Sequence, residues 1–199
     1  MGEIKSALEL ALEKTQDIKS NKAHLEAQDI NKEGRRMATR YLSNPDNEEN
    51  DIRKQLDAQK DEAKMKMLKQ GVLDALMANL VLPQNREFAD WMGVLTKAFG
   101  LAVKDRKKVD SLFKQLEGFF IQYLDNREKI QKSLEAQFAP RLKQKEEQLS
   151  KQMGSKVKIN PSQDPEFINF LKGNLGQLEE QYRKALDEAK LELKKLAEA

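Results

Sequence analysis

Apolar residues recur at alternating spacings of three and four along most of this chain, and this constrains the fold more than any other feature. An α-helix turns once every 3.6 residues, so such spacing lines up apolar side chains on one helix face, whereas a β-strand needs a period of two. The sequence therefore predicts an all-α protein, with at most a short extended piece near residues 157–159. The pattern is clearest in an N-terminal series (Ile4, Leu8, Ala11, Thr15, Ile18, Lys22, Leu25), in which Lys22 is a polar interruption, and in a C-terminal series (Ile168, Leu171, Leu175, Leu178, Tyr182, Ala185, Ala189).

The stripes are narrow, and the composition indicates which kind of helical protein they suit. Hydrophobic residues make up 39% of the 199 residues and charged residues 35%, so the chain has less apolar surface to bury than a typical globular domain. A narrow stripe needs a partner helix rather than a broad core. We therefore predict long helices that form coiled-coil hairpin arms around a small central helical bundle.

The apolar residues are densest in the middle of the chain, in the stretch "GVLDALMANLVLPQNREFADWMGVLTKAFGLAV". We interpret residues 1–199 as a single helical domain with its apolar core at about 68–124. Helical arms are expected at about 2–67 and 125–199, and a connector at 154–164 interrupts the second arm.

Prolines, glycines and one aspartate predict where helices end. The stretch "SNPDNEEND" is predicted to be a break, and a helix is expected over about 46–81. In the first segment, over 2–42, Gly34 is expected to weaken or bend the helix. Gly100 is a predicted C-terminal cap of a helix over about 84–99. Pro140 is expected to kink or break a long helix near Phe138–Ala139. In "DPE", Asp164 suits the N-cap of the last helix and is followed by proline at its first position.

The connector "SKVKINPSQ" is longer than a helical hairpin requires and carries two apolar residues, Val157 and Ile159. One hypothesis is that they form a partner contact at the tip of the hairpin, through an edge that another chain pairs with. The alternative is that they pack back on Phe167 or Phe170, as a hydrophobic staple does before an N-cap. We favour the staple for Ile159 and the partner contact for Val157.

The residue inventory excludes several kinds of chemistry. The chain has no cysteine and a single histidine, His24, which removes zinc sites built from Cys and His and makes a Ser-His-Asp triad implausible. No phosphate-binding glycine motif occurs. Carboxylates are interleaved with lysines, as on solvated helix faces. We therefore expect no enzyme, no catalytic residue, no metal and no cofactor.

Two basic clusters, at residues 35–40 and 104–108, offer the alternative function of binding nucleic acid or an anionic membrane surface. The candidate anion contacts are Arg35, Arg36, Lys104, Arg106, Lys107 and Lys108. Against this reading, the net charge is only +3, both signs are interleaved, and no aromatic residue accompanies either cluster to stack on bases. The pattern thus argues against nucleic acid as a partner.

The opening "MGEIKSALELALEKT" together with "INPSQDPEFINFLKGNLGQLEEQY" resembles an uncharacterised family of bacterial helical proteins, and the resemblance covers the two ends better than the middle. It implies a bacterial cytoplasmic protein of unknown function and transfers no site residue. The absence of cysteine is compatible with a cytoplasmic location, and no apolar run is long enough to span a bilayer.

These observations favour a non-enzymatic structural or adaptor protein that acts through coiled-coil helix pairing. We expect a homo-oligomer, with a dimer favoured, because shared stripes bury more apolar surface than isolated arms. Another helical protein is the second candidate partner.

Overall fold

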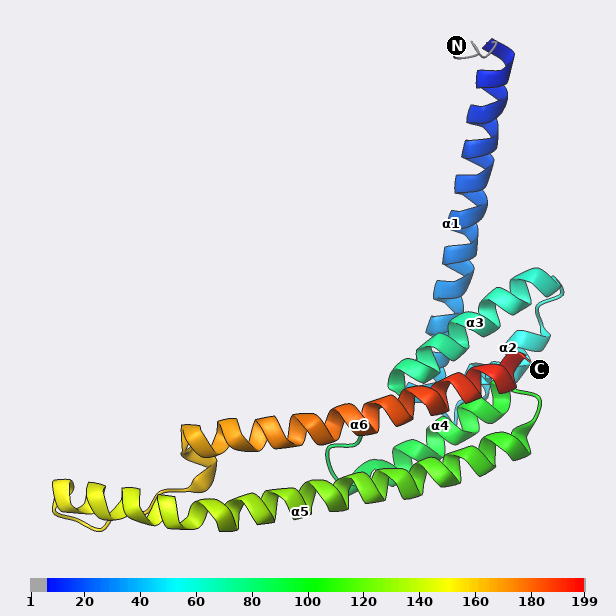
Figure 1. Ribbon diagram of the computed structural model, residues 1–199. Coiled ribbons are helices and arrows are strands. Elements are labelled where there is room, and N and C mark those ends of the chain that lie inside the picture. The colour runs from blue at the N-terminus through cyan, green and yellow to red at the C-terminus, as the bar shows by residue number, and fades with distance from the viewer. Residues whose placement is uncertain (1–6, 199) are drawn as a thin grey trace. The chain divides into compact units, whose positions relative to one another are not determined.

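The computed structural model confirms the all-α prediction. It describes residues 7–198, with side chains described from His24 onward, and over this range the regular elements are all helices (Figure 1). Residues 7–198 form six α-helices, which are joined in three places through short 3-10 helices. Their bounds are α1 (Ala7–Ser43), η1 (Glu48–Asn50), α2 (Ile52–Asp57), α3 (Glu62–Asn79), η2 (Arg86–Phe88), α4 (Ala89–Ala102), α5 (Arg106–Met153), η3 (Pro161–Gln163) and α6 (Pro165–Glu198).

The chain divides into two compact units. Unit 1 contains the chain up to Leu80, the segment Gly93–Asp110 and the end of α6 from Lys194. Unit 2 contains Val81–Met92 and Ser111–Leu193.

Unit 1 is organised around the crossing of α1 and α3. Gly34 and Gly71 meet there: a methyl group added to Gly34 would lie 2.1 Å from the carbonyl oxygen of Leu68, and one added to Gly71 would lie 2.1 Å from that of Asn31. Only glycine allows the two backbones this close. The predicted weak point at Gly34 is therefore wrong, since α1 continues through it and the glycine serves the helix crossing instead.

The prediction of one continuous helix over 46–81 is also wrong, because this stretch forms three separate elements, η1, α2 and α3. Two aspartates start new helices within it. The carboxylate of Asp51 accepts from the backbone N–H of Lys54 at 2.9 Å, and that of Asp61 accepts from those of Ala63 at 2.9 Å and Lys64 at 3.1 Å. An N-cap of this kind satisfies the first amides of one helix and competes with continuation of the previous one.

Helix α4 runs past Gly100 to Ala102, so the predicted cap at Gly100 is wrong. Its terminal carbonyls are satisfied by a side chain from α2. The guanidinium of Arg53 donates to the carbonyl oxygens of Gly100 at 2.7 Å, Leu101 at 3.2 Å and Val103 at 3.0 Å. A cation at this position also complements the negative end of the helix dipole.

In unit 2, α5 and α6 lie side by side in antiparallel orientation. The rings of Phe138 and Phe167 contact one another at a centroid distance of 5.5 Å, and toward the other end those of Tyr123 and Tyr182 do so at 5.2 Å. These contacts belong to two buried clusters. One contains Leu134, Phe138, Leu142 and Phe167, and the other Tyr123, Leu124 and Leu178. Coiled-coil geometry for this pair stays a prediction.

Pro140 does not break α5, which is continuous from Arg106 to Met153. Proline removes one backbone hydrogen bond, here the one to the carbonyl of Ala136. Pro140 and Ala136 are both exposed, so water can reach the freed carbonyl. Phe138 and Leu142 are buried on either side of Pro140 and hold the helix in place across it.

The ends of the connector follow the sequence prediction. Helix α5 stops just before Gly154, which has a φ of 65°, and α6 begins at Pro165. The carboxylate of Asp164 accepts from the backbone N–H of Phe167 at 3.0 Å and pairs with the amino group of Lys145 on α5 at 2.7 Å. Asp164 thus caps α6 and links it to α5.

We expect Asp164→Ala to lower the Tm by about 3 °C, because it removes the cap and the partner of Lys145. The hydrogen bond from Lys145, followed by that from Phe167, lowers the pKa of Asp164. A lowered carboxyl pKa stabilises the fold above the unfolded-state value, near 3.8, and this contribution is lost as the pH falls through the native pKa. Thermal melts between pH 6 and pH 2 should therefore show the Tm gap between wild type and Asp164→Asn closing in acid. A gap that is unchanged at pH 2 would contradict the assignment.

Candidate functional site

The arginines of the first basic cluster lie on α1 and face carboxylates of the same unit. Arg35 pairs with Asp74 of α3 at 3.3 Å, while Arg36 and Arg40 both pair with Glu33, at 3.4 and 2.6 Å. Internal pairing leaves less positive charge for an external polyanion. Anion binding by Arg35 and Arg36 stays a prediction.

The members of the second basic cluster have different surroundings in the structure. Lys108 pairs with Asp105 at 3.1 Å, and Arg106 lies 3.9 Å from Asp110. Lys107 is exposed on α5. Lys104, in the loop between α4 and α5, instead lines a cavity in unit 1. Of the six residues predicted to contact anions, it is the one that lines this cavity.

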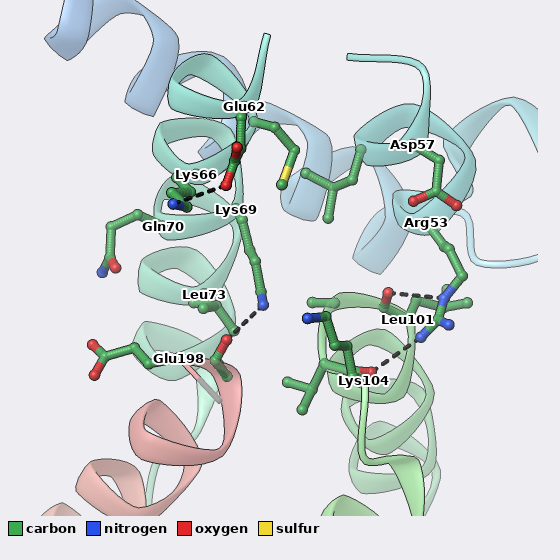
Figure 2. Close-up of a pocket in the computed structure, with 15 residues that line it drawn as sticks. Arg53, Asp57, Glu62, Lys66, Lys69, Gln70, Leu73, Leu101, Lys104 and Glu198 are labelled. Atoms are coloured by element: carbon green, nitrogen blue, oxygen red, sulfur yellow. Dashed lines mark hydrogen bonds and ion pairs between the residues drawn. The ribbon is translucent and has the colours of Figure 1, made fainter. Parts of the chain in front are cut away.

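This cavity has a volume of about 490 Å³ and is the candidate site (Figure 2). Its walls come from α2, α3, the end of α4 with the following loop, and the last residues of α6. The lining residues are Arg53, Leu56, Asp57, Glu62, Met65, Lys66, Lys69, Gln70, Leu73, Leu101, Ala102, Val103, Lys104, Ala197 and Glu198. The cavity therefore combines an apolar lining with several charged groups.

Two of the four cations around the cavity are already engaged. Arg53 uses its guanidinium on the end of α4, as described above. Lys66 pairs with Glu62 one turn away at 3.1 Å. The remaining positive charges belong to Lys69 and Lys104.

Lys69 was not predicted from the sequence as a site residue. It is half-buried, and its amino group donates to the carbonyl oxygen of Ala197. Burial, and then the positive charge of Lys104, lower the pKa of Lys69. The sequence does hold a signal for it, because Met65, Lys69 and Leu73 are spaced by four and share one face of α3. A lysine between two apolar positions on one helix face indicates a partly buried cation.

No group of three or more His, Asp or Glu residues within the described part of the chain could hold a metal ion. His24 is exposed on α1, and its Nε2 lies 2.9 Å from the side-chain amide of Gln28. Nothing in these positions assigns catalysis, and the absence of enzyme activity stays a prediction.

In the connector, the two apolar residues have different surroundings. Ile159 packs against the cluster of Leu134, Phe138, Leu142 and Phe167, and its backbone N–H donates to the carboxylate of Glu146 at 2.8 Å. Val157 is half-buried, and its N–H donates to Ser150 Oγ at 2.9 Å. Ile159 thus packs back on the cluster that contains Phe167. A partner contact at Val157 and Ile159 stays a prediction.

A second hollow lies in unit 1 where α1 and α3 cross, and we call it the α1 groove. Leu25, Ile30 and Leu68 give it an apolar floor, and its volume is about 540 Å³. Its other lining residues are Glu26, Asp29, Glu33 and Gln59. Leu25, the last member of the N-terminal stripe, is 60% exposed. The earlier members of that stripe lie outside the described side chains.

Over the described residues, no helix is both long enough and apolar enough to cross a membrane.

The family of unknown function DUF6657 matches residues 57–195. The chain belongs to this family. No curated protein and no solved structure matches the chain. The expectation of an uncharacterised family is thereby confirmed, while a bacterial source stays a prediction.

Some of the candidate residues lie within the DUF6657 match and others lie before it. It includes α3 and most of α6, and with them Lys69, Lys104 and the connector. Helix α1 and Arg53 precede it. The N-terminal stretch "MGEIKSALELALEKT" therefore lies outside the part that defines DUF6657.

Proposed function

We propose that the chain is a non-enzymatic structural or adaptor protein that acts by pairing its long helices, and that its first partner is a second copy of itself through α1. The observation that carries the proposal is the exposure of Leu25 on a stripe with coiled-coil spacing. An apolar stripe with this spacing pairs with a partner helix, and Leu25, its last member, is 60% exposed.

In unit 1, α3 is too short to run along the whole of α1. Helix α1 has 37 residues and α3 has 18, so at about 1.5 Å per residue α1 is roughly twice as long. Lys64, near the start of α3, pairs with Glu26 at 3.2 Å. In Figure 1, α1 continues beyond this end of α3. Leu25, which directly precedes Glu26 in the sequence, therefore lies near the start of α3, and α3 leaves it exposed.

A second copy suits this role because a heptad-like stripe pairs best with a stripe of the same repeat. The charges beside the groove support it too. Glu26, Asp29 and Glu33 lie along its edge, and their ion-pair partners include Lys64, Lys32 and Arg40. Positively and negatively charged side chains thus lie on the same surface, as a self-complementary interface requires.

Light scattering after size exclusion should give twice the 22.9 kDa of one chain at micromolar concentration. Leu25→Asp should shift the mass to that of one chain, because a carboxylate in an apolar helix seam is costly to bury. Leu191→Asp is the matched control, since Leu191 is also 60% exposed but lies on α6. A wild-type mass of 22.9 kDa would overturn the dimer.

The salt dependence of the interaction distinguishes this proposal from the alternative of polyanion binding by the basic clusters. Apolar pairing should persist between 50 mM and 1 M salt. Binding to nucleic acid or to anionic vesicles should instead weaken steeply, because it releases counterions. Tight, salt-sensitive capture by either polyanion, with a monomer in the same buffer, would favour the alternative.

A further inference from the structure

We propose that the cavity of unit 1 binds a small organic anion with an apolar body, of the alkyl carboxylate class, and that its carboxylate lies between the amino groups of Lys69 and Lys104. The proposal concerns a site separate from the proposed helix pairing, so either can fail without the other.

The first support is the placement of the two lysines. They come from α3 and from the loop after α4, 35 positions apart in the sequence. Figure 2 shows both amino groups directed into the space between these elements. Lys69 donates one of its three hydrogens to Ala197, which leaves two for a ligand. The amino group of Lys104 has no hydrogen-bond or ion-pair partner among the described residues.

The carboxylates that line the cavity do not neutralise this pair. Glu62 is engaged with Lys66. In Figure 2 the side chain of Glu198 points away from Lys104, and Asp57 lies apart, near Arg53. The neighbouring positive charge contributes to the lowered pKa of Lys69, and an anion placed between the two amino groups would relieve that repulsion.

The second support is the chemistry of the remaining wall, which selects the class of anion. Leu56, Met65, Leu73, Leu101 and Val103 line the cavity and would contact a hydrocarbon body. The volume of about 490 Å³ lies within the range of small-molecule sites, roughly 300–1,000 Å³. No aromatic side chain is among the lining residues, so the site lacks a platform for stacking a nucleotide base.

Isothermal titration calorimetry on the full chain tests the proposal, with octanoate as the probe and with 1-octanol and inorganic phosphate as comparators. We expect octanoate to bind at least about tenfold more tightly than either comparator, because it alone has both the charge and the apolar chain. Lys104→Gln should weaken octanoate binding by about 10- to 100-fold. Lys104→Arg should retain most of it.

Lys107→Gln is the matched control, because it removes one positive charge from an exposed position nearby that does not line the cavity. Circular dichroism of each variant checks that the helical fold is intact. Three results would overturn the proposal: no octanoate binding by the wild type, equal affinity for 1-octanol, or equal affinity for phosphate. An equal loss in Lys107→Gln and Lys104→Gln would also overturn it, because it would show a general charge effect.

Discussion

Gly34→Ala is expected to lower the free energy of unfolding by about 3 kcal/mol, at the upper end of the cost of overpacking. The added methyl group would lie 2.1 Å from the carbonyl oxygen of Leu68, where ordinary contact begins at 3.4 Å. The obstacle is backbone and cannot rotate away, so α1 and α3 must move apart. This cost exceeds the gain of about 1 kcal/mol that alanine normally brings to a helix interior. Urea denaturation followed by circular dichroism measures the change.

Gly93→Ala provides the control for this prediction. Gly93 lies inside α4 in unit 1, and a methyl group there meets nothing within 4 Å. The substitution should leave stability unchanged or raise it by up to about 1 kcal/mol. Gly71→Ala should behave like Gly34→Ala, and the double variant should cost less than the sum, since one separation of the helices relieves both contacts. Equal effects at Gly34 and Gly93 would contradict the close crossing.

Phe167→Ala is expected to cost about 3–4 kcal/mol of unfolding free energy. Phe167 is 1% exposed, and its ring packs edge-on against Phe138 at a centroid distance of 5.5 Å, in a cluster with Leu134 and Leu142. Its loss leaves a cavity between α5 and α6 that these neighbours fill only in part. Denaturation in urea, monitored by helicity, measures the loss.

Phe170→Ala is the matched control for Phe167→Ala. Phe170 lies on the same helix and also contacts the ring of Phe138, at 5.4 Å, but it is 43% exposed. The substitution should cost about half as much as Phe167→Ala, because nearly half of Phe170 remains in contact with water. A cost at Phe170 that matches the cost at Phe167 would show that the cluster is not the core of this helix pair.

The sequence by itself determined those features that depend on residues within a few positions of one another. Three-four spacing predicts helices wherever it occurs, because it reports which face of a helix is apolar. The end of α5 before Gly154 and the start of α6 at Asp164 and Pro165 are similarly local, since a positive φ and an N-cap involve only neighbouring residues. Asp51 and Asp61 are also potential N-caps, but the apolar stripe continues across both and predicts one uninterrupted helix over 46–81.

Tertiary structure decided whether local breakers act as breakers. When only their neighbours are considered, Gly34 predicts a weak or bent point in its helix, and Pro140 predicts a kink or break. In unit 1, Gly34 permits a close crossing with α3, and in unit 2, buried residues on either side of Pro140 hold α5 against α6. Packing of a whole helix face outweighs one lost hydrogen bond or the flexibility of one glycine.

The candidate site depends even more on long-range contacts. The sequence places Lys104 in a basic cluster with Arg106, Lys107 and Lys108, yet of these four it is the one that lines the cavity, together with Lys69. Lys69 in turn contacts Ala197, 128 positions later in the chain. Spacing along a helix cannot encode such a meeting, because it depends on how α3, the end of α4 and the end of α6 pack within unit 1.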